Sequence, residues 1–179
     1  MINIALNDPY SGYTVRKAKL EDMDEIIHLL KTAAQWVQAK GIEQWGHLLT
    51  GEEDAKIQSD IQSDTTYVVE QNNQLVATFN LSNQQNEWDI CMWGHREDNA
   101  FYLHRFAVGS RYHGKGIGKQ ILQWMDNQLT GTNCFLRLDC VADNSGLNQL
   151  YKHAGFVYLK QKDIDGDLFS LYQKSFVKS

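Results

Sequence analysis

Three glycines at alternate positions mark the stretch of this sequence that could bind an anionic group: Gly114, Gly116 and Gly118. They follow a run of β-branched and aromatic residues at 101–108, which predicts a strand. Apolar residues then recur at helical spacing at Ile121, Leu122, Met125 and Leu129. Glycines lack a Cβ atom and the first amides of a helix lack intrahelical acceptors, so an anion can approach several N–H donors and the positive end of the helix dipole. Residues 100–129 therefore predict a strand, a phosphate-binding loop and a helix.

The spacing of the glycines distinguishes between kinds of phosphate loop. A dinucleotide-binding loop requires G-x-G-x-x-G, and Lys119 stands where its third glycine should be. A P-loop requires G-x-x-x-x-G-K-[ST]; the match begins at Gly109 and fails at its last position, Gly116, which has no hydroxyl for Mg²⁺. A degenerate P-loop nucleotide hydrolase stays open as an alternative. So does a plain tight turn, although a turn leaves the local basic residues unexplained: Arg111, His113, Lys115 and Lys119.

Two motifs resemble those of the GNAT superfamily of N-acetyltransferases. Residues 111–116, Arg-Tyr-His-Gly-Lys-Gly, match the signature R/Q-x-x-G-x-G/A. Residues 144–156 resemble the segment N-x-x-A-x-x-L-Y-x-x-x-G-F, with Leu147 where the family commonly has alanine. The motifs occur in the family's order and cover roughly the C-terminal third to half of the chain. We identify the sequence as a member on these residues.

The resemblance implies an α/β fold: a mixed, mostly antiparallel central sheet with a splayed strand pair and helices on both faces. The length of 179 residues suits one domain, so residues 1–179 are expected to form a single acetyltransferase domain. The helices are expected after the acidic group at 21–25, ending at Gly41, and over residues 52–61. A further helix should run from Asn144, as its cap, to His153, with Gly155 ending it. The strands are expected at 13–18, as an edge strand, and at 65–70, 75–81, 134–141, 156–159 and 168–176. Residues 82–99 are interpreted as either a long loop or a strand extension.

The resemblance also implies the activity, which is transfer of the acetyl group of acetyl-CoA directly to a primary amine of a small molecule or peptide. Loop amides would bind the pyrophosphate of coenzyme A, and the strand ending at Val108 would pair with its pantetheine. The residues expected to bind the cofactor are Phe106, Ala107, Val108, Arg111, Tyr112, His113, Gly114, Lys115, Gly116, Ile117, Gly118, Lys119, Asn144 and Tyr151.

Two side chains are candidates for proton transfer. Tyr151 matches the family position whose hydroxyl lies near the cofactor sulfur, and a protonated phenol can donate to a departing thiolate. His104 is similar to a histidine of serotonin N-acetyltransferase implicated in amine deprotonation. Two alternatives stay open: water could be the base, or His104 could have a purely structural role. A non-catalytic acyl-CoA sensor or interaction module on the same fold is the alternative function. The acceptor amine is not readable from the sequence, nor is the oligomeric state, although a homodimer would be in keeping with the family.

Composition limits the remaining classes of function. The net charge of −5, with no long basic stripe, argues against a nucleic-acid partner. Neither a signal peptide in the first ten residues nor a run of 18 apolar residues is present, so we expect a cytoplasmic protein with no membrane partner. Cys134 and Cys140 are expected to be buried reduced thiols. Cys91 and His95 supply too few ligands for zinc, and the acidic turn at 163–167 reads as a solvated hairpin tip, so no metal site is predicted.

Overall fold

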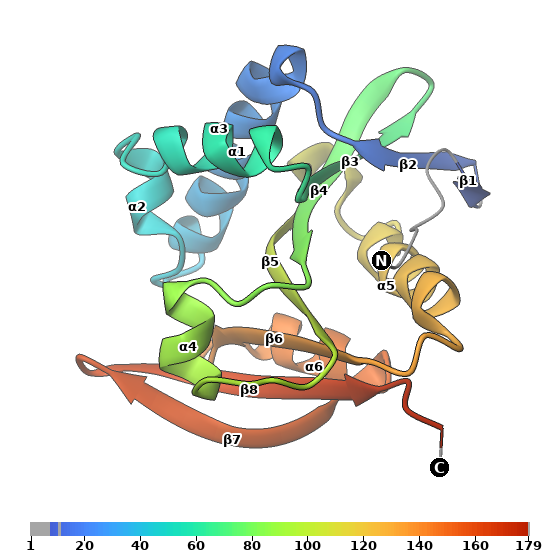
Figure 1. The fold of residues 1–179 in the computed structure, drawn as a ribbon. Helices are drawn as coiled ribbons and strands as arrows, with labels where there is room; N and C mark the ends of the chain where they lie inside the picture. The colour runs from blue at the N-terminus through green and yellow to red at the C-terminus, as the bar shows by residue number, and fades with distance from the viewer. Residues whose placement is uncertain (1–7, 11, 179) are drawn as a thin grey trace. The chain divides into compact units, whose positions relative to one another are not determined.

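The computed structural model describes residues 8–10 and 12–178, and its chain divides into two units (Figure 1). The first unit contains the described residues up to 81 together with residues 105–121. The second contains residues 82–104 and 122–178. Strand β5 (Ala100–Val108) and helix α5 (Ile117–Leu129) each pass from one unit to the other along the sequence. We describe the two units separately.

Four antiparallel strands form the sheet of the first unit, in the order β1 (Asp8–Tyr10), β2 (Tyr13–Lys17), β3 (Thr66–Gln71) and β4 (Gln74–Ser82). Because β1 pairs with the outer side of β2, the prediction of residues 13–18 as an edge strand is wrong. The strands predicted at 65–70 and 75–81 are confirmed as β3 and β4, which pair antiparallel as a hairpin. It turns through two asparagines, Asn72 (φ 52°) and Asn73 (φ 60°), a residue type that tolerates the left-handed region that such turns require.

The helices of the first unit follow β2 in sequence: η1 (Leu20–Asp22), α1 (Met23–Ala39), α2 (Gly46–Leu49) and α3 (Asp54–Gln62). The apolar stripe of α1 packs against α2, α3 and the strands. Together these elements enclose one cluster of buried apolar side chains. The buried members of that cluster are Ala18, Ile26, Leu29, Leu30, Ala33, Ala34, Leu48, Ile57, Ile61, Val68 and Ala107. Gly41, with φ of 77°, follows the last turn of α1 and confirms the predicted stop.

In the second unit the strand order is β5, β6 (Phe135–Val141), β8 (Asp167–Ser175) and β7 (Val157–Ile164). The β5–β6 pair is parallel and the other two pairs are antiparallel, which confirms the predicted mixed sheet. The parallel ladder is short, and its last pair is Tyr102 with Arg137. The ladder therefore ends where these strands are predicted to splay.

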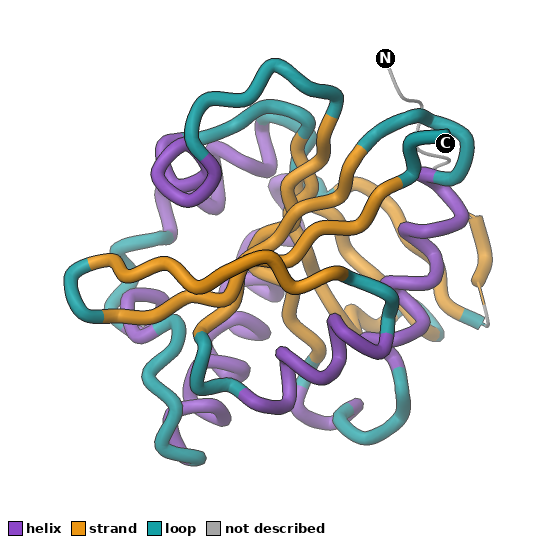
Figure 2. The backbone as a smooth tube through the Cα atoms, turned by 90° about the horizontal axis from the view of Figure 1, so that it is seen from below, coloured by secondary structure: helices purple, strands orange, loops and turns teal. Residues whose placement is uncertain are grey.

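Helices cover both faces of the sheet in the second unit, as predicted. Leu171 on β8 packs into a cluster with residues of α4 (Glu87–Trp93), whereas the next residue, Tyr172, contacts Tyr151 of α6 (Ser145–His153). Successive side chains of a strand point to opposite faces, so α4 and α6 lie on opposite sides of β8. Figure 2 shows β7 and β8 as a two-stranded ribbon. Its tip is closed by Asp165 and Gly166, both with positive φ, as the hairpin prediction required.

The structure corrects the prediction for residues 82–99. This segment is neither a long loop nor a strand extension, because it contains helix α4. Asn86 begins the helix, since its Oδ1 accepts the N–H of Asp89 at 2.8 Å while Asp89 Oδ2 accepts the N–H of Asn86 at 3.1 Å. Met92 and Trp93 then bury the inner face of α4. The capping pair was present in the sequence, but seven residues are too few for a clear helical period.

Arg137 is a buried charge in the core of the second unit. Its side chain is 2% exposed and donates to both carboxylate oxygens of Asp98, at 2.8 and 2.5 Å, and to the hydroxyl of Tyr102 at 3.1 Å. The guanidinium hydrogen bonds lower the pKa of Asp98. Its Nε also donates to Oε1 of Gln173 at 2.8 Å, so all three guanidinium nitrogens are hydrogen-bonded inside the protein, as a structural buried cation requires.

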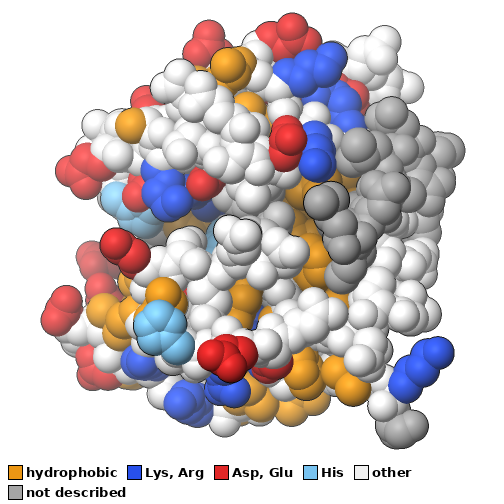
Figure 3. Space-filling model, in the orientation of Figure 1, with side chains coloured by type: hydrophobic (Ala, Val, Ile, Leu, Met, Phe, Trp, Pro, Cys, Tyr) orange, Lys and Arg blue, Asp and Glu red, His pale blue; other side chains and the backbone are white. Residues whose placement is uncertain are grey.

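The remaining sequence predictions concern thiols and surface charge. Cys134 and Cys140 are buried and free, as predicted, and Cys91 is exposed and free. Acidic and basic side chains are interspersed on the face shown in Figure 3. Within the described ranges no helix has the length and apolar character to cross a bilayer, and no three His, Cys, Asp or Glu side chains are placed to hold a metal ion.

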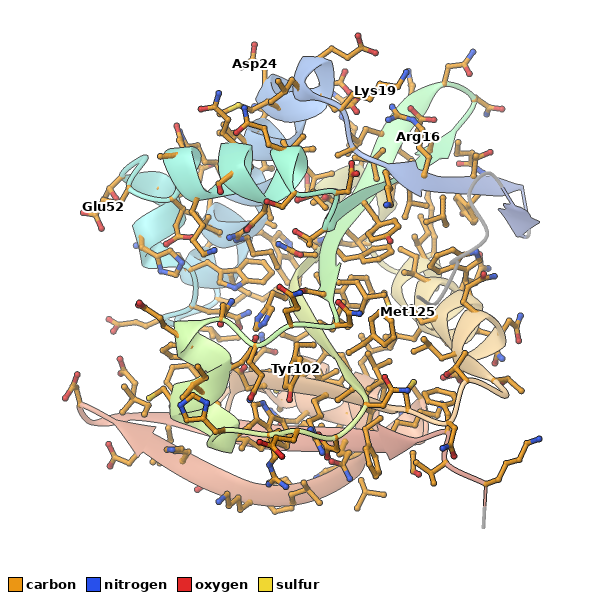
Figure 4. The ribbon with its side chains drawn as sticks, viewed as in Figure 1. Arg16, Lys19, Asp24, Glu52, Tyr102 and Met125 are labelled. Atoms are coloured by element: carbon orange, nitrogen blue, oxygen red, sulfur yellow. The ribbon has the colours of Figure 1, made fainter. Side chains whose placement is uncertain are left out.

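We expect Asp22→Asn to destabilise the first unit at its β2–α1 corner. Arg16, labelled in Figure 4, donates to both Asp22 oxygens at 2.8 Å and to Glu70 at 2.7 Å, and the Arg16 hydrogen bonds lower the pKa of Asp22. The free energy of unfolding should fall by about 1–2 kcal/mol at neutral pH. A lowered folded pKa stabilises the protein above the unfolded pKa of Asp, about 3.9, and this stabilisation disappears as the pH falls through the folded pKa. Urea unfolding at several pH values measures both effects.

Asp64→Asn is the matched control for this experiment. Asp64 is 70% exposed and lies 4.0 Å from Lys17, so its loss should change the free energy of unfolding by less than about 0.5 kcal/mol. Equal effects of the two substitutions would show that the Arg16 contacts contribute nothing beyond surface charge.

Candidate functional site

The loop between β5 and α5, in the first unit, is held in shape by its own backbone. Gly109 donates its N–H to the carbonyl of Val76 on β4 at 2.8 Å, and η2 (Ser110–Tyr112) follows. The N–H of Tyr112 bonds to the carbonyl of Gly109 at 2.9 Å. The Nε2 atom of His113 lies 2.9 Å from the carbonyl of Val108. These bonds join the loop to both strands that precede it.

Two of the three predicted glycines have the backbone conformation that favours glycine. Gly114 has φ of 75° and Gly116 has φ of 73°, and a Cβ atom built on either would meet no atom within 4 Å. Conformation, rather than crowding inside the protein, therefore requires glycine here, and the space beside each Cα is open. Gly118 differs from the prediction, because it is the second residue of α5 and not part of the loop.

The amides of residues 114–119 are free of backbone acceptors within the described part of the chain. The N–H of His113 bonds to the carbonyl of Ser110, and the next amide to find a backbone acceptor is that of Gln120, which donates to Gly116 at 3.1 Å. The last three free amides belong to the first turn of α5, where the helix dipole adds partial positive charge. Six consecutive free donors at one loop and helix start are the kind of backbone arrangement that an anion can satisfy.

The side chains of the loop add positive charge without closing it. Arg111, Lys115 and Lys119 are exposed, whereas Ile117 is buried and contributes only its amide. Tyr112 is half-buried and donates its hydroxyl to Gln74 at 3.3 Å. Together, free amides, open glycines and basic side chains fit the diphosphate of coenzyme A.

His113 is packed into the first unit from the side of α1. Its ring makes an edge contact with Trp36 at 4.4 Å between centroids, and the Nζ atom of Lys40 lies 3.6 Å from the centre of the Trp36 ring. The sequence indicated His113 as a local positive charge and as one of the residues expected to bind the cofactor. The contact with Trp36 gives it a structural role as well.

The last residues of β5 lie beside a backbone irregularity that the sequence did not indicate. Arg105 has φ of 46° inside the strand, a conformation that costs a non-glycine residue about 1–2 kcal/mol. Its guanidinium is held on α3 by Asp60 at 2.7 Å, with Glu53 at 3.6 Å. Beyond it, Phe106 contacts Phe79, and Ala107 joins the α1 cluster. Of the residues predicted to meet pantetheine, these two side chains are therefore core, which leaves ligand contacts to their backbone.

Asn144 and Tyr151 lie in the second unit, on and before α6. Asn144 caps the helix as predicted, with Oδ1 accepting the N–H of Leu147 at 3.1 Å. Tyr151 is buried between Phe156 and Tyr172, at 5.7 and 5.9 Å between ring centroids. Burial raises the pKa of Tyr151, and the neighbouring Cys140 and Asp139 act in the same direction, so its phenol stays protonated.

His104 also lies in the second unit, two residues past the end of the β5–β6 ladder. Its Nε2 atom is 2.8 Å from Oδ1 of Asp89, and the two side chains are 18% and 2% exposed. Asp139 on β6 is the other carboxylate acting on the imidazole, and its Oδ1 accepts the indole N–H of Trp88 at 3.1 Å. Burial raises the pKa of Asp139. Asp89 acts in the same direction, whereas His104 and the hydrogen bond from Trp88 oppose the shift. We call His104, Asp89, Asp139 and Trp88 the His104 cluster.

The predicted residues thus fall into two groups. The first unit brings together the loop and strand residues from 106 to 119, and the second holds His104, Asn144 and Tyr151. Within the second unit, the Asp139 carboxylate acts electrostatically on both His104 and Tyr151. Sequence reasoning missed Asp89, for which the only signal was its place in the Asn86 capping box.

Comparison with known proteins agrees with the two motifs. A model of the acetyltransferase (GNAT) family matches residues 30–156. The uncharacterized N-acetyltransferase YesJ of Bacillus subtilis is 32% identical over 165 residues, which cover 91% of this chain and 90% of YesJ.

Solved structures share the fold over nearly the whole chain. A GNAT-family acetyltransferase from Streptococcus agalactiae 2603 has a TM-score of 0.80 at 21% identity, covering 94% of this chain and 98% of its own. PaiA N-acetyltransferase from Thermoplasma acidophilum, solved in complex with coenzyme A, has a TM-score of 0.68 at 22% identity, covering 91% and 98%. The fold and the resemblance are confirmed, and the chain belongs to the acetyltransferase (GNAT) family.

Proposed function

We propose that this protein transfers the acetyl group of acetyl-CoA to a primary amine of a small molecule or peptide. The observation that supports this most is the run of free amides at residues 114–119 behind two left-handed glycines. Membership of the family supports acetyl transfer, and the complex of PaiA with coenzyme A shows that ligand on a protein of the same fold.

The loop would bind the diphosphate through backbone donors, because amides fixed by the fold need no reorganisation when the anion arrives. Arg111, Lys115 and Lys119 would add charge attraction from the exposed rim. The backbone of residues 106–108 would pair with the amide groups of pantetheine. Asn144 would act mainly by fixing the start of α6, which carries Tyr151.

When bound, acetyl-CoA supplies a thioester whose C–S bond breaks as the amine nitrogen bonds to the acetyl carbon. His104 would accept a proton from the amine, since an imidazole in its neutral form has one free ring nitrogen. Tyr151 would donate its hydroxyl proton to the departing sulfur, because a phenol kept neutral by burial is still a hydrogen-bond donor. Both proton transfers would thus use side chains of the second unit.

Gly116→Ala should weaken binding of coenzyme A at least about tenfold, because a Cβ at φ of 73° strains the loop and occupies the open space beside the amides. Gly166→Ala is the matched control. Gly166 has φ of 93° and equally open surroundings in the β7–β8 turn, so it should lose similar stability without losing affinity. Calorimetry measures the affinity of each variant for coenzyme A.

The same method with Mg²⁺ and ATP tests the alternative functions. Tighter binding of ATP than of coenzyme A would favour the P-loop alternative. Binding of coenzyme A without thiol release from acetyl-CoA with any amine would favour a sensor.

His104→Gln should lower kcat about a hundredfold and remove the acidic limb of the pH–rate profile while leaving the KM for acetyl-CoA unchanged. The limb arises because a protonated imidazole cannot accept a proton. His153→Gln, an exposed histidine on α6, is the control and should behave as the wild type. A pH profile unchanged by His104→Gln would assign deprotonation to water.

Tyr151→Phe should lower kcat at least about tenfold with unchanged affinity for coenzyme A, since only the hydroxyl is lost. Tyr172→Phe separates catalysis from packing: Tyr172 donates to Asn148 Oδ1 at 2.7 Å, so its loss should cost about 1 kcal/mol of stability and leave kcat unaffected. Similar kcat values for Tyr151→Phe and the wild type would restrict Tyr151 to a packing role.

A further inference from the structure

The His104 cluster contains a carboxylate that the proposed chemistry has not used. Asp89 is 1% exposed, and its two oxygens have different surroundings. Oδ2 accepts the backbone N–H of Asn86, which ties the side chain to the first turn of α4. Oδ1 lies 2.8 Å from Nε2 of His104. The helix cap therefore fixes the position of the carboxylate that faces the imidazole.

The two facing atoms have no alternative partner. Asp89 Oδ1 and His104 Nε2 are both buried from water, and neither has a hydrogen bond of regular geometry among the described residues, although the two atoms lie within hydrogen-bond distance of each other at 2.8 Å. A buried carboxylate oxygen is an acceptor, so the ring nitrogen opposite it is the one that carries hydrogen in the lower-energy tautomer.

We propose that Asp89 is a positioning residue for His104: it accepts the Nε2–H of the imidazole and leaves Nδ1 as the atom that takes the proton from the acceptor amine. This inference rests on the proposed function. It assigns the tautomer of the base and names the group that sets it.

The charges around the imidazole favour the same assignment. When His104 takes up a proton, the imidazolium lies against the Asp89 carboxylate, with Asp139 as the second acidic neighbour. The nearby cation on β6, Arg137, is engaged by Asp98 and Tyr102. The Asp139 carboxylate accepts the indole N–H of Trp88, whereas Asp89 Oδ1 faces the ring nitrogen, so Asp89 is the acidic group in direct contact with the imidazole. Asp89 would therefore stabilise the protonated base as well as orient it.

Asp89→Asn tests the proposal with little change in shape. The amide oxygen can still accept the N–H of Asn86, while the amide NH₂ would face Nε2 and favour the tautomer with hydrogen on Nδ1. We expect kcat to fall at least about tenfold, toward the value of His104→Gln, with an unchanged KM for acetyl-CoA. In the double variant Asp89→Asn/His104→Gln, the Asp89 substitution should cause no further loss, because a positioning residue acts only through its partner.

Asp163→Asn is the control for loss of one acidic charge. Asp163 also accepts a backbone N–H, from Gly166 at 2.8 Å, but it lies in the β7–β8 turn. It should leave kcat within about twofold of the wild type. An Asp89→Asn variant with wild-type kcat, or an additive loss in the double variant, would overturn the proposal.

A measurement without turnover separates this inference from the proposed function. Long-range ¹H–¹⁵N correlation spectra distinguish the two imidazole tautomers, and the difference from His104→Gln assigns the signals of His104. We expect Nε2–H in the wild type and a shift toward Nδ1–H in Asp89→Asn. Nδ1–H in the wild type would overturn the proposal even if Asp89→Asn failed to fold. Absence of acetyl transfer by the wild type, with Nε2–H observed, would instead reject the proposed function alone and leave the Asp89–His104 link intact.

Discussion

Backbone amides without acceptors are the constraint on which the proposed function depends. A chain normally pairs its N–H groups within itself, and here residues 114–119 do not, because the loop has just turned through two left-handed glycines and the helix has only begun. Such donors remain favourable only if water or an anion satisfies them. The exposed basic side chains around the loop make an anion the better partner.

That loop is anchored by contacts that do not involve Gly114 or Gly116. Gly109 is joined to β4, His113 reaches back to Val108, and Trp36 packs against the His113 ring. Flexible residues are thus confined between fixed points. A binding site made of backbone needs this arrangement, because donors that had to be ordered on binding would lose affinity.

In the second unit, one buried charged group stabilises the core and another is proposed to exchange a proton. Arg137 has Asp98 and Tyr102 around it and no polar atom to spare, so it stabilises the core. His104 and Asp89 face each other with one contact, and the imidazole retains partial exposure. A titratable group that is ordered yet incompletely satisfied is the kind that can exchange a proton.

Local sequence determined much of this protein. The period of α5, the Asn144 cap, the asparagine turn of β3–β4 and the alternate glycines each depend on neighbours within a few residues, and each was predictable for that reason. The two motifs were sufficient for the family. Only the tertiary structure decided what depends on residues far apart in the chain. It placed β1 outside β2, gave Arg105 a left-handed conformation with its guanidinium paired to Asp60, and buried Met92 and Trp93 on one face of α4. It also brought Asp89 against His104, because a contact between a helix and a strand depends on packing, which no local pattern records.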